Sequence, residues 1–483
     1  MDTDVLGWIV ALGVPLAYAL GAVSAVDAVL RTRTPQGATA WMLALLALPF
    51  VALPLYWIFG RAKFDEYIHA LRAFDAEVET RLGQARAGRL DEWVVRPEAE
   101  PDLRTRGELQ GFRDLSTLPF TRGNSVRLLV DGRATFDAIF EAIEAAQAYV
   151  LVQFYIIRDD ALGRALQQRL IDAAGRGVQV FLLYDEVGSH SLPGSYLRAL
   201  REAGVAVSGF SGRRSWLGRF RLNFRNHRKI VVVDGERAYM GGLNVGDEYL
   251  GRDPALSPWR DTHLAVEGPA VLGLQFSFAR DWYYGRRETP ALRWDVTPAA
   301  QDRRVLVLAS GPADPLETCG LLFTHAIESA ERRVWIASPY FVPDGRVLGA
   351  LQLAALRGVD VRVLMPRQSD SLLFRYVPYA YLSEIQEAGV QVYLYEDGFM
   401  HQKVVLVDED YAAVSTANLD NRSFRFNFEV TCLANDAGFC GEVAAMLEDD
   451  LTRSSLLSPR PLAKRSLGFR LAVQGTRLLA PVL

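Results

Sequence analysis

The sequence predicts an α/β fold, in which two duplicated α/β sandwich lobes follow an N-terminal hairpin of two transmembrane helices. Three observations support this prediction. A short motif of catalytic residue types occurs twice, the segments around it are also duplicated, and two long uncharged segments stand at the start of the chain. With 483 residues, the chain is long enough for two lobes of ordinary domain size.

The duplicated motif has the pattern H-x-K-x4-D. Its two copies contain six residues that we predict to be catalytic: His227, Lys229, Asp234, His401, Lys403 and Asp408. At one shared distance after each Asp stand two small residues, any residue and an Asn. These positions supply the predicted substrate-binding residues: Asn244, Asn418, Ser415 and Thr416. The chain has only six histidines and four lysines, so two such matches are not a coincidence.

These residue types suit the chemistry of a phosphodiester. The apolar runs Ile230–Val233 and Val404–Val407 predict buried strands. Alternation along a strand puts the His and the Lys of each copy on one face, where a phosphate oxygen can bridge them. One imidazole can attack phosphorus while the other protonates the leaving alkoxide. The two motifs therefore predict a single site, made by two lobes that meet at a pseudo-twofold axis.

Other reactive residues carry no comparable pattern. Four further histidines (His69, His190, His263 and His325) are interpreted as satisfied structural residues. The three cysteines lack the paired spacing of zinc ligands or of a disulfide framework. Asp234 and Asp408, although part of the motif, are better suited to its local structure than to proton transfer.

The duplication extends upstream of each motif. An Ala-Ala-x-Arg-Gly-Val segment precedes predicted strands at Val178–Tyr184 and Val359–Met365, and further strands are predicted at Tyr149–Ile157 and Arg333–Val342. Strands that alternate with helices in both halves predict an α/β sandwich in each. The predicted organisation is a hairpin (1–62), a helical linker (63–115), a first lobe (116–296), a second lobe (297–455) and a basic tail (456–483).

The N-terminal region predicts membrane insertion. Val5–Val26 and Ala38–Gly60 are each uncharged over more than the roughly 20 residues needed to cross a bilayer. A cleavable signal peptide fits less well, because Asp2 and Asp4 replace the usual basic residues and a second span follows at once. We therefore expect a multi-pass membrane protein with two transmembrane helices. Arginines flank both spans, so the charge pattern leaves the orientation open.

Two basic segments interleaved with apolar residues predict contact with anionic lipid headgroups. They are Arg213–Lys229 and the tail Leu456–Leu483, neither of which contains an acidic residue. A solvated loop and an ordinary docking helix are the alternatives. Nucleic acid also suits a basic aromatic segment, but a membrane hairpin disfavours it as a partner. The sequence leaves open a homo-oligomer.

The chain resembles the phospholipase D superfamily and, within it, the bacterial cardiolipin synthases. The resemblance covers almost the whole length and rests on five segments: Asn223–Lys229, Gly241–Gly251, Trp259–His263, Ser338–Pro343 and Asn418–Glu429. It implies two phospholipase D-like lobes that transfer a phosphatidyl group between phosphatidylglycerol molecules through a phosphohistidine, with no metal or nucleotide cofactor. It also implies His227 as the nucleophile and His401 as the acid and base.

The resemblance further implies two carboxylates that orient the imidazoles. Glu429, 28 residues after His401, matches the acid of the second half, and Asp261 is the equivalent in the first half. Gly241 and Gly242 stand where the second half has two hydroxyl residues, so equal phosphate contacts from both halves are not expected. Three alternatives remain: a membrane-bound phospholipase D that uses water, a phosphodiesterase-type nuclease, and a phosphatidylserine synthase. A non-enzymatic scaffold is disfavoured because both half-sites keep His, Lys and Asn.

Overall fold

The computed structural model describes residues 3–32, 34–60, 67–68, 74, 90–210, 223–459 and 462–482. The chain divides into two compact units. One contains residues 1–69 and 212–224, and the other contains residues 70–211 and 225–483. Most of the predicted linker before residue 90, and most of the basic segment that begins at Arg213, lie outside the described residues.

The N-terminal unit is helical, but its second predicted span is not one helix. Its elements are α1 (Thr3–Arg31), α2 (Pro35–Ala47), α3 (Pro49–Leu55) and the π-helical turn η1 (Tyr56–Gly60). The α-helix breaks at Leu48, because Pro49 has no N–H to continue the hydrogen-bond ladder. With 13 residues, α2 is about 20 Å long and too short to cross a bilayer alone.

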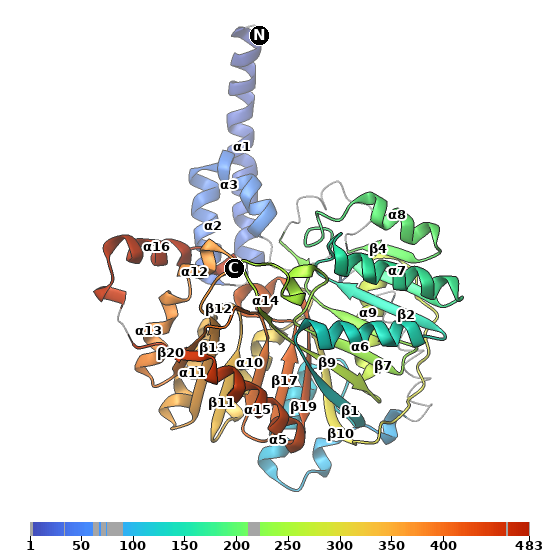
Figure 1. The fold of residues 1–483 in the computed structure, drawn as a ribbon. Helices are drawn as coiled ribbons and strands as arrows, with labels where there is room; N and C mark the ends of the chain where they lie inside the picture. Colours follow the sequence, from blue (N-terminus) through green and yellow to red (C-terminus); the bar gives the residue numbers. More distant parts are fainter. Residues whose placement is uncertain are drawn as a thin grey trace. The chain divides into compact units, whose positions relative to one another are not determined.

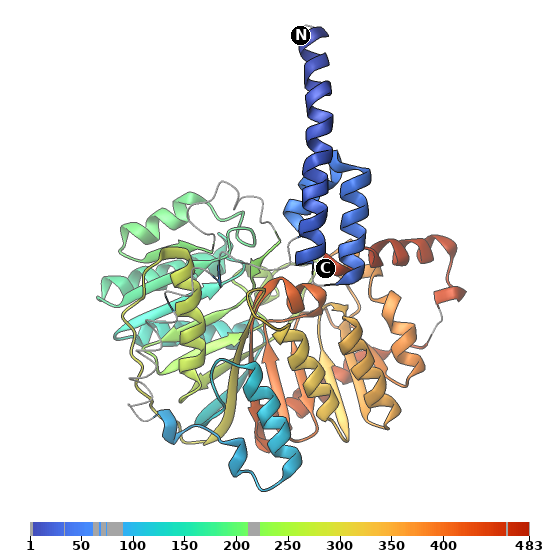
Figure 2. The same ribbon diagram turned by 180° about the vertical axis from the view of Figure 1, so that it is seen from behind.

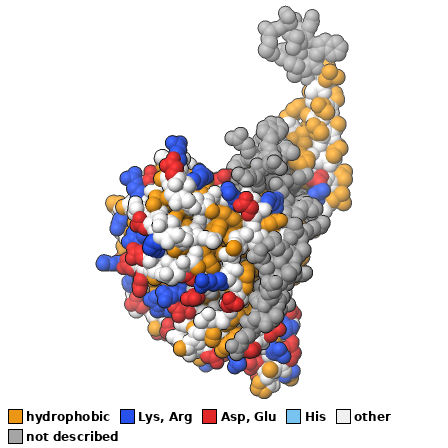
Figure 3. Space-filling view, turned by 90° about the vertical axis from the view of Figure 1, so that its right-hand side faces the viewer, with side chains coloured by type: hydrophobic (Ala, Val, Ile, Leu, Met, Phe, Trp, Pro, Cys, Tyr) orange, Lys and Arg blue, Asp and Glu red, His pale blue; other side chains and the backbone are white. Residues whose placement is uncertain are grey.

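In the described part of the chain, one helix has the length and composition of a membrane span, Ala11–Arg31. The two-helix hairpin is therefore not confirmed, although α2 and α3 lie against α1 within this unit (Figures 1 and 2). A methyl group added to Gly21 would lie 2.6 Å from the Leu45 carbonyl oxygen, so α1 and α2 pack closely. The Tyr56 hydroxyl donates a hydrogen bond to Asp27 at 2.8 Å. Exposed apolar side chains cover much of α1 (Figure 3).

The larger unit is built on one continuous mixed sheet. Its strand order is β20-β14-β13-β11-β16-β17-β19-β10-β1-β9-β7-β6-β2-β3-β4. The first-lobe strands are β1 (Thr121–Val130), β2 (Tyr149–Phe154), β3 (Gln179–Tyr184), β4 (Ala206–Gly209), β6 (Ile230–Val233), β7 (Arg237–Gly241) and β9 (Thr262–Glu267). The second-lobe strands are β10 (Arg303–Ser310), β11 (Arg333–Ala337), β13 (Asp360–Pro366), β14 (Gln391–Tyr395), β16 (Val404–Val407), β17 (Tyr411–Ser415), β19 (Asn427–Asn435) and β20 (Ser454–Leu456).

Strand order reveals the duplication directly. Reading outward from the antiparallel pair β1 and β10, each lobe repeats the same sequence of antiparallel strands followed by parallel ones, and the second lobe adds β20, which is antiparallel to β14. The sequence predicted two sandwiches, and the structure joins their sheets edge to edge. The predicted boundary at residues 296 and 297 falls between the end of α9 at Arg286 and the start of β10 at Arg303.

Helices cover both faces of this sheet. Figure 1 shows α6 (Asp131–Ala145), α7 (Ala161–Gly175) and α15 (Ala437–Thr452) in front of it. Figure 2 shows α5 (Leu103–Leu115), α9 (Val271–Arg286), α10 (Thr318–Ser329) and α11 (Gly345–Leu356) behind it. The remaining helices are α8 (Gly194–Glu202), α12 (Leu372–Tyr376), α13 (Tyr379–Glu387), α14 (Asn421–Arg425) and α16 (Leu467–Arg477). Each lobe has its own core, led by Phe136, Ile143 and Leu170 in the first and by Phe323, Leu351 and Ile385 in the second.

The Asp that ends each motif holds the backbone at the start of another strand of the same lobe. Asp234 accepts hydrogen bonds from the backbone N–H groups of residues 147, 148 and 149, at 2.7–2.9 Å. Asp408 accepts three equivalent bonds from residues 331, 332 and 333, each at 2.8 Å. Both carboxylates lie at the opposite end of their strand from the histidine, and both residues have a positive φ. The structure therefore does not bring these two predicted catalytic residues to the histidines.

We expect Asp234→Ala to destabilise the protein by about 3 kcal/mol, because it leaves three backbone donors without their charged acceptor. Thermal and denaturant unfolding of the full chain in detergent measures this loss. The matched control is Asp137→Ala, since that carboxylate is 74% exposed. Activity per folded molecule should stay close to that of the unmodified chain. A stable variant with abolished activity would instead give Asp234 a direct chemical role.

Candidate active site

Two short parallel strand pairs cross from one lobe to the other, and we call them the seam. In the first pair, β5 (Arg225–Asn226) lies beside the start of β19, where Asn226 is the partner of Phe428. In the second, β15 (Phe399–Met400) lies beside β8 (Trp259–Arg260). Each pair ends where a histidine of one lobe meets an acid of the other. The backbone N–H of His227 donates to Phe428 at 2.9 Å, and that of His401 donates to Arg260 at 2.8 Å.

The seam exchanges the predicted acids between the lobes. Nδ1 of His227 lies 2.9 Å from the Glu429 carboxylate, and Nδ1 of His401 lies 2.9 Å from that of Asp261. The sequence had assigned one acid to each half, and the structure pairs each acid with the imidazole of the opposite half. Both carboxylates are fully buried. A carboxylate at Nδ1 fixes the tautomer, so that Nε2 carries the reactive lone pair.

The electrostatics of these pairs favour a neutral imidazole beside an anionic carboxylate. Burial lowers the pKa of His227 to about 4 and that of His401 to about 3, despite the neighbouring acids. Burial alone would raise the pKa of Glu429, but His227 and Lys229 lower it to about 2. Burial likewise acts to raise the pKa of Asp261, and Lys403 together with His401 shifts it below its usual value. Both histidines are therefore ready to accept a proton or to attack at neutral pH.

Lys229 and Lys403, the lysines of the two motifs, couple the two halves of the site electrostatically. Each lysine acts on the imidazole of the other lobe, since Lys403 lowers the pKa of His227 and Lys229 lowers that of His401. Both ammonium groups are buried, which lowers the pKa of Lys229 to about 7 and that of Lys403 to about 8. Two buried cations beside two neutral imidazoles form an environment in which a bound anion is stabilised.

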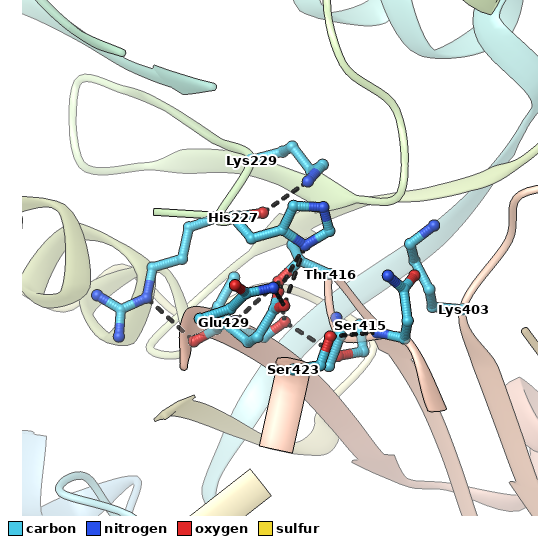
Figure 4. Close-up of polar contacts among 12 residues, drawn as sticks. His227, Lys229, Lys403, Ser415, Thr416, Ser423 and Glu429 are labelled. Carbon is cyan, nitrogen blue, oxygen red and sulfur yellow. Dashed lines mark hydrogen bonds and ion pairs between the residues drawn. The ribbon is translucent and has the colours of Figure 1, made fainter. Parts of the chain in front are cut away.

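The two lysines make different contacts. Lys229 Nζ donates to the His227 carbonyl oxygen at 2.6 Å and lies over the Tyr155 ring (Figure 4). Lys403 Nζ lies 3.0 Å from Nδ1 and 3.1 Å from Nε2 of His401, and it also contacts that residue's carbonyl oxygen. No partner of the His227 Nε2 atom is found among the described residues. Lys403 therefore contacts the imidazole ring of its own motif, whereas Lys229 contacts a carbonyl oxygen and an aromatic ring.

The predicted substrate-binding residues divide into two groups. Asn244 is engaged internally, because it accepts from the Ile156 N–H at 3.1 Å and donates to the Tyr249 hydroxyl at 3.0 Å. Asn418 is buried, and its Oδ1 has no hydrogen-bond partner within the described residues. Of these four positions, Asn418 thus has the side chain that keeps an unused polar atom beside the site.

Thr416 supports the acid, whereas Ser415 bonds to the neighbouring strand. The Thr416 hydroxyl donates to Glu429 at 2.6 Å (Figure 4), and the Ser415 hydroxyl pairs with that of Thr431 at 2.7 Å. In the first lobe, a methyl group at Gly242 would lie 2.0 Å from the Asp261 carboxylate. The Asp261 carboxylate occupies the space that a side chain at position 242 would need. Glycine is therefore required at that position.

Sequence reasoning missed two buried ion pairs behind the imidazoles. Nη1 of Arg228 donates to both carboxylate oxygens of Asp281 at 2.8 Å, and Arg260 makes a bidentate contact with Asp450 at 2.7 and 2.8 Å. All four side chains are at least 95% buried. Arg228 follows the first histidine whereas Arg260 precedes the first-lobe acid, so the duplication alone does not align them. No local pattern marks these pairs, because the partners lie 53 and 190 residues apart in the chain.

Comparison with known proteins agrees with this geometry. A family model described as "Cardiolipin synthase, PLD-like domain" matches residues 139–256 and 323–451, and one described as "Phospholipase_D-nuclease N-terminal" matches residues 19–61. A Pseudomonas putida (strain W619) protein named cardiolipin synthase A is 48% identical over 97% of both chains. The chain belongs to this family. A Pseudomonas aeruginosa (strain LESB58) protein of the same name is 50% identical over 96% of this chain and 94% of its own.

Solved structures support the fold. The crystal structure of phosphatidylserine synthase from Haemophilus influenzae superposes with a TM-score of 0.60 at 15% identity, over 78% of this chain and all of that one. The phospholipase D-like α/β architecture with a mixed sheet is thus shared at low sequence identity. What distinguishes this chain from other members of the superfamily lies in its side chains.

A third imidazole lies behind the first-lobe acid. His263 is buried, and neither of its ring nitrogens has a hydrogen-bond partner among the described residues, whereas the sequence predicted a satisfied core histidine. Burial lowers its pKa to about 3. A methyl group at Gly241 would lie 2.7 Å from its Nδ1, so this glycine makes room for the ring. In the second lobe, the strand positions that correspond to Gly241 and His263 are Ser415 and Thr431, whose hydroxyl groups are hydrogen-bonded to each other.

We expect the protein to lose stability as the pH falls below about 6.5. The unfolded chain then protonates its histidines, while His227, His263 and His401 stay neutral in the fold down to about pH 4 or 3. Each contributes a slope of up to about 1.4 kcal/mol per pH unit. His263→Leu should remove one such slope, measured by unfolding in detergent between pH 7 and 4.5. Surface His190→Leu is the control, and an unchanged slope in His263→Leu would contradict this interpretation.

Proposed function

We propose that this chain is a cardiolipin synthase that joins two phosphatidylglycerol molecules and releases glycerol. The observation that carries the proposal is the pair of imidazoles at the seam, each held by the carboxylate of the other lobe. The family and the relatives named cardiolipin synthase A support this substrate class. The proposed reaction is a phosphatidyl transfer in two steps, with the covalent intermediate on a histidine.

In the first step, Nε2 of His227 attacks the phosphorus of the donor lipid. His401 takes up a proton as the anionic phosphodiester binds. A phosphorus–nitrogen bond then forms, the bond from phosphorus to the glycerol oxygen breaks, and His401 gives that proton to the glycerol oxygen. Its low resting pKa does not prevent this, because the anionic phosphodiester adds a negative charge beside the imidazole and raises its pKa. Lys229 and Lys403 stabilise the charge on the equatorial oxygens. Glu429 stabilises the charge that develops on the His227 ring.

In the second step, the terminal hydroxyl of another phosphatidylglycerol replaces glycerol. His401, now neutral, takes the proton of that hydroxyl while its oxygen attacks phosphorus. The phosphorus–nitrogen bond breaks, and His227 returns to its neutral form. The leaving group and the acceptor present the same chemical group, a primary glycerol hydroxyl, so one acid and base serves both steps. No energy source beyond the phosphodiester is required.

Two observations support His227 as the nucleophile. Its Nε2 has no partner among the described residues, whereas both ring nitrogens of His401 lie within 3.1 Å of Lys403 Nζ. The carboxylate that holds His227, Glu429, accepts further hydrogen bonds from Thr416 and Asn427. Asp261, the carboxylate of His401, receives its only other short bond from the Thr262 N–H in the described structure. The better-anchored pair suits the residue that must carry the covalent group.

The test is to give the purified full chain phosphatidylglycerol alone in detergent micelles. We expect cardiolipin and glycerol, and no turnover with His227→Asn or His401→Asn. Rapid quenching in denaturant at neutral to alkaline pH, where phosphohistidine survives, should trap labelled phosphatidyl on the unmodified chain, and proteolysis should place the label on the peptide that contains His227. A label on the peptide that contains His401 would assign the nucleophile to His401. Phosphatidic acid as the main product would replace the synthase by a hydrolase.

We further propose that α1 and the α2–α3–η1 segment cross the membrane together as a hairpin, and that the basic tail lies on anionic lipids. The apolar composition of both segments and their close packing support the hairpin. In the tail, Leu467, Leu471 and Leu478 are each more than 60% exposed on or beside α16, and Phe469 packs on Tyr376 and Tyr379. This arrangement fits a helix docked on the body with a free apolar edge.

A hairpin puts the N-terminus and the catalytic body on one side of the membrane, whereas a single span separates them. The test uses a membrane-impermeant maleimide on spheroplasts of a bacterial host, with Asp2→Cys or Leu353→Cys. Leu353 is 57% exposed, and the three native cysteines are buried. We expect both introduced cysteines to be labelled in the same preparation, either intact or lysed. The unmodified chain is the control, and labelling in opposite preparations would rule out the hairpin.

A further inference from the structure

Arg228 connects the two members of the first imidazole–carboxylate pair. It follows His227 directly in the chain, and its Nε donates to the backbone carbonyl oxygen of Glu429 at 3.0 Å. Its Nη2 donates to the carbonyl oxygen of Ser310, the strand partner of Glu429, at 3.0 Å. This buried guanidinium group thus joins the segment that carries the imidazole to the strand that carries the acid, across the seam.

Arg260 makes the equivalent connection in the second pair. It directly precedes Asp261, and its Nη1 donates to the Asp261 carbonyl oxygen at 2.7 Å. Its own carbonyl oxygen accepts from the His401 N–H at 2.8 Å. Arg260 comes from the first lobe and His401 from the second, so this connection also crosses the seam. In each pair, one arginine fixes the backbone of the acid relative to the backbone of the imidazole.

A buried aspartate in turn fixes each guanidinium group. Asp281 on α9 accepts from Arg228, and Asp450 on α15 accepts from Arg260. The two helices follow β9 and β19, the strands that continue from the two acids, and they cover opposite faces of the sheet (Figures 1 and 2). Gln402, which follows the second histidine as Arg228 follows the first, donates to Asp450 at 2.8 Å. We call Arg228 and Asp281 the first ion pair, and Arg260 and Asp450 the second ion pair.

Stability alone does not account for two buried ion pairs at these places. Taking their charges out of water costs free energy, and well-packed apolar side chains of similar size are often as stable or more stable. What an apolar side chain cannot do is donate to the carbonyl oxygens of Glu429 and Asp261, as both arginines do. A displacement of about 1 Å at a reacting group can lower the rate by about 100-fold. A rigid, hydrogen-bonded support therefore has a use here that an apolar core lacks.

We propose that the two ion pairs are positioning devices with separate tasks. The first holds Glu429 against the nucleophile His227. The second holds Asp261 against the general acid His401. This inference rests on the proposed function, because it uses the roles that the reaction gives to the two imidazoles. Each ion pair acts through the carboxylate that orients its imidazole, so the first should matter for every donor lipid and the second only where the leaving group needs a proton.

Two donors with different leaving groups separate these tasks. Phosphatidylglycerol releases a glycerol alkoxide, which needs a proton, whereas phosphatidyl-p-nitrophenol releases a phenolate that is stable without one. The first turnover of the full chain in detergent gives the rate of the first step for each donor, as released glycerol or p-nitrophenolate. We expect Asp450→Asn to slow glycerol release by about tenfold or more, and p-nitrophenolate release by less than about threefold. Asp281→Asn should slow both by a similar factor, because attack by His227 is common to both donors.

The matched control is Asp449→Asn, which makes the same change at the neighbouring carboxylate of α15. That side chain is 71% exposed, and its loss should alter neither rate. Asp450→Asn leaves the Arg260 cation buried without its partner, which can prevent folding. In that case the double variant Arg260→Gln with Asp450→Asn removes both charges together and permits the same comparison between donors.

A purely structural role predicts a different result, because a loss of folded protein slows both donors equally. Equal losses with Asp450→Asn, or with the double variant, would therefore overturn the proposal, as would a loss confined to glycerol release in Asp281→Asn. The proposed function has a separate criterion. An unmodified chain that releases glycerol but forms no cardiolipin would refute the synthase, while the two variants would still decide the tasks of the ion pairs.

Discussion

The active site depends on the exchange of carboxylates across the seam. Neither lobe contains a complete imidazole–carboxylate pair, because His227 relies on Glu429 and His401 relies on Asp261. Both carboxylates are fully removed from solvent, where an anion is costly unless a partner compensates it. Docking of the lobes therefore supplies that compensation and completes the chemistry in one event. A continuous sheet through β1 and β10 fixes the lobes in the register that this exchange requires.

The duplicated halves reach the same result with different residues. Glu429 has the hydroxyl of Thr416 beside it, whereas the shorter Asp261 approaches the bare backbone of Gly242. Both buried arginines, Arg228 and Arg260, come from the first half, and one binds Asp281 of its own lobe while the other binds Asp450 of the second lobe. Function thus constrains the charges and the spaces around the imidazoles more tightly than it constrains the residue at each repeated position.

The sequence predicted what depends on local pattern. The strands before each motif appear at Tyr149–Phe154 and Arg333–Ala337, as alternation and β-branched runs indicated. It could not predict which acid meets which imidazole, because that choice depends on β5 and β15, strands of two residues with no periodicity to detect. The hydropathy of Ala38–Gly60 predicted one helix. A single proline at position 49 divides it, since hydropathy does not register a missing N–H.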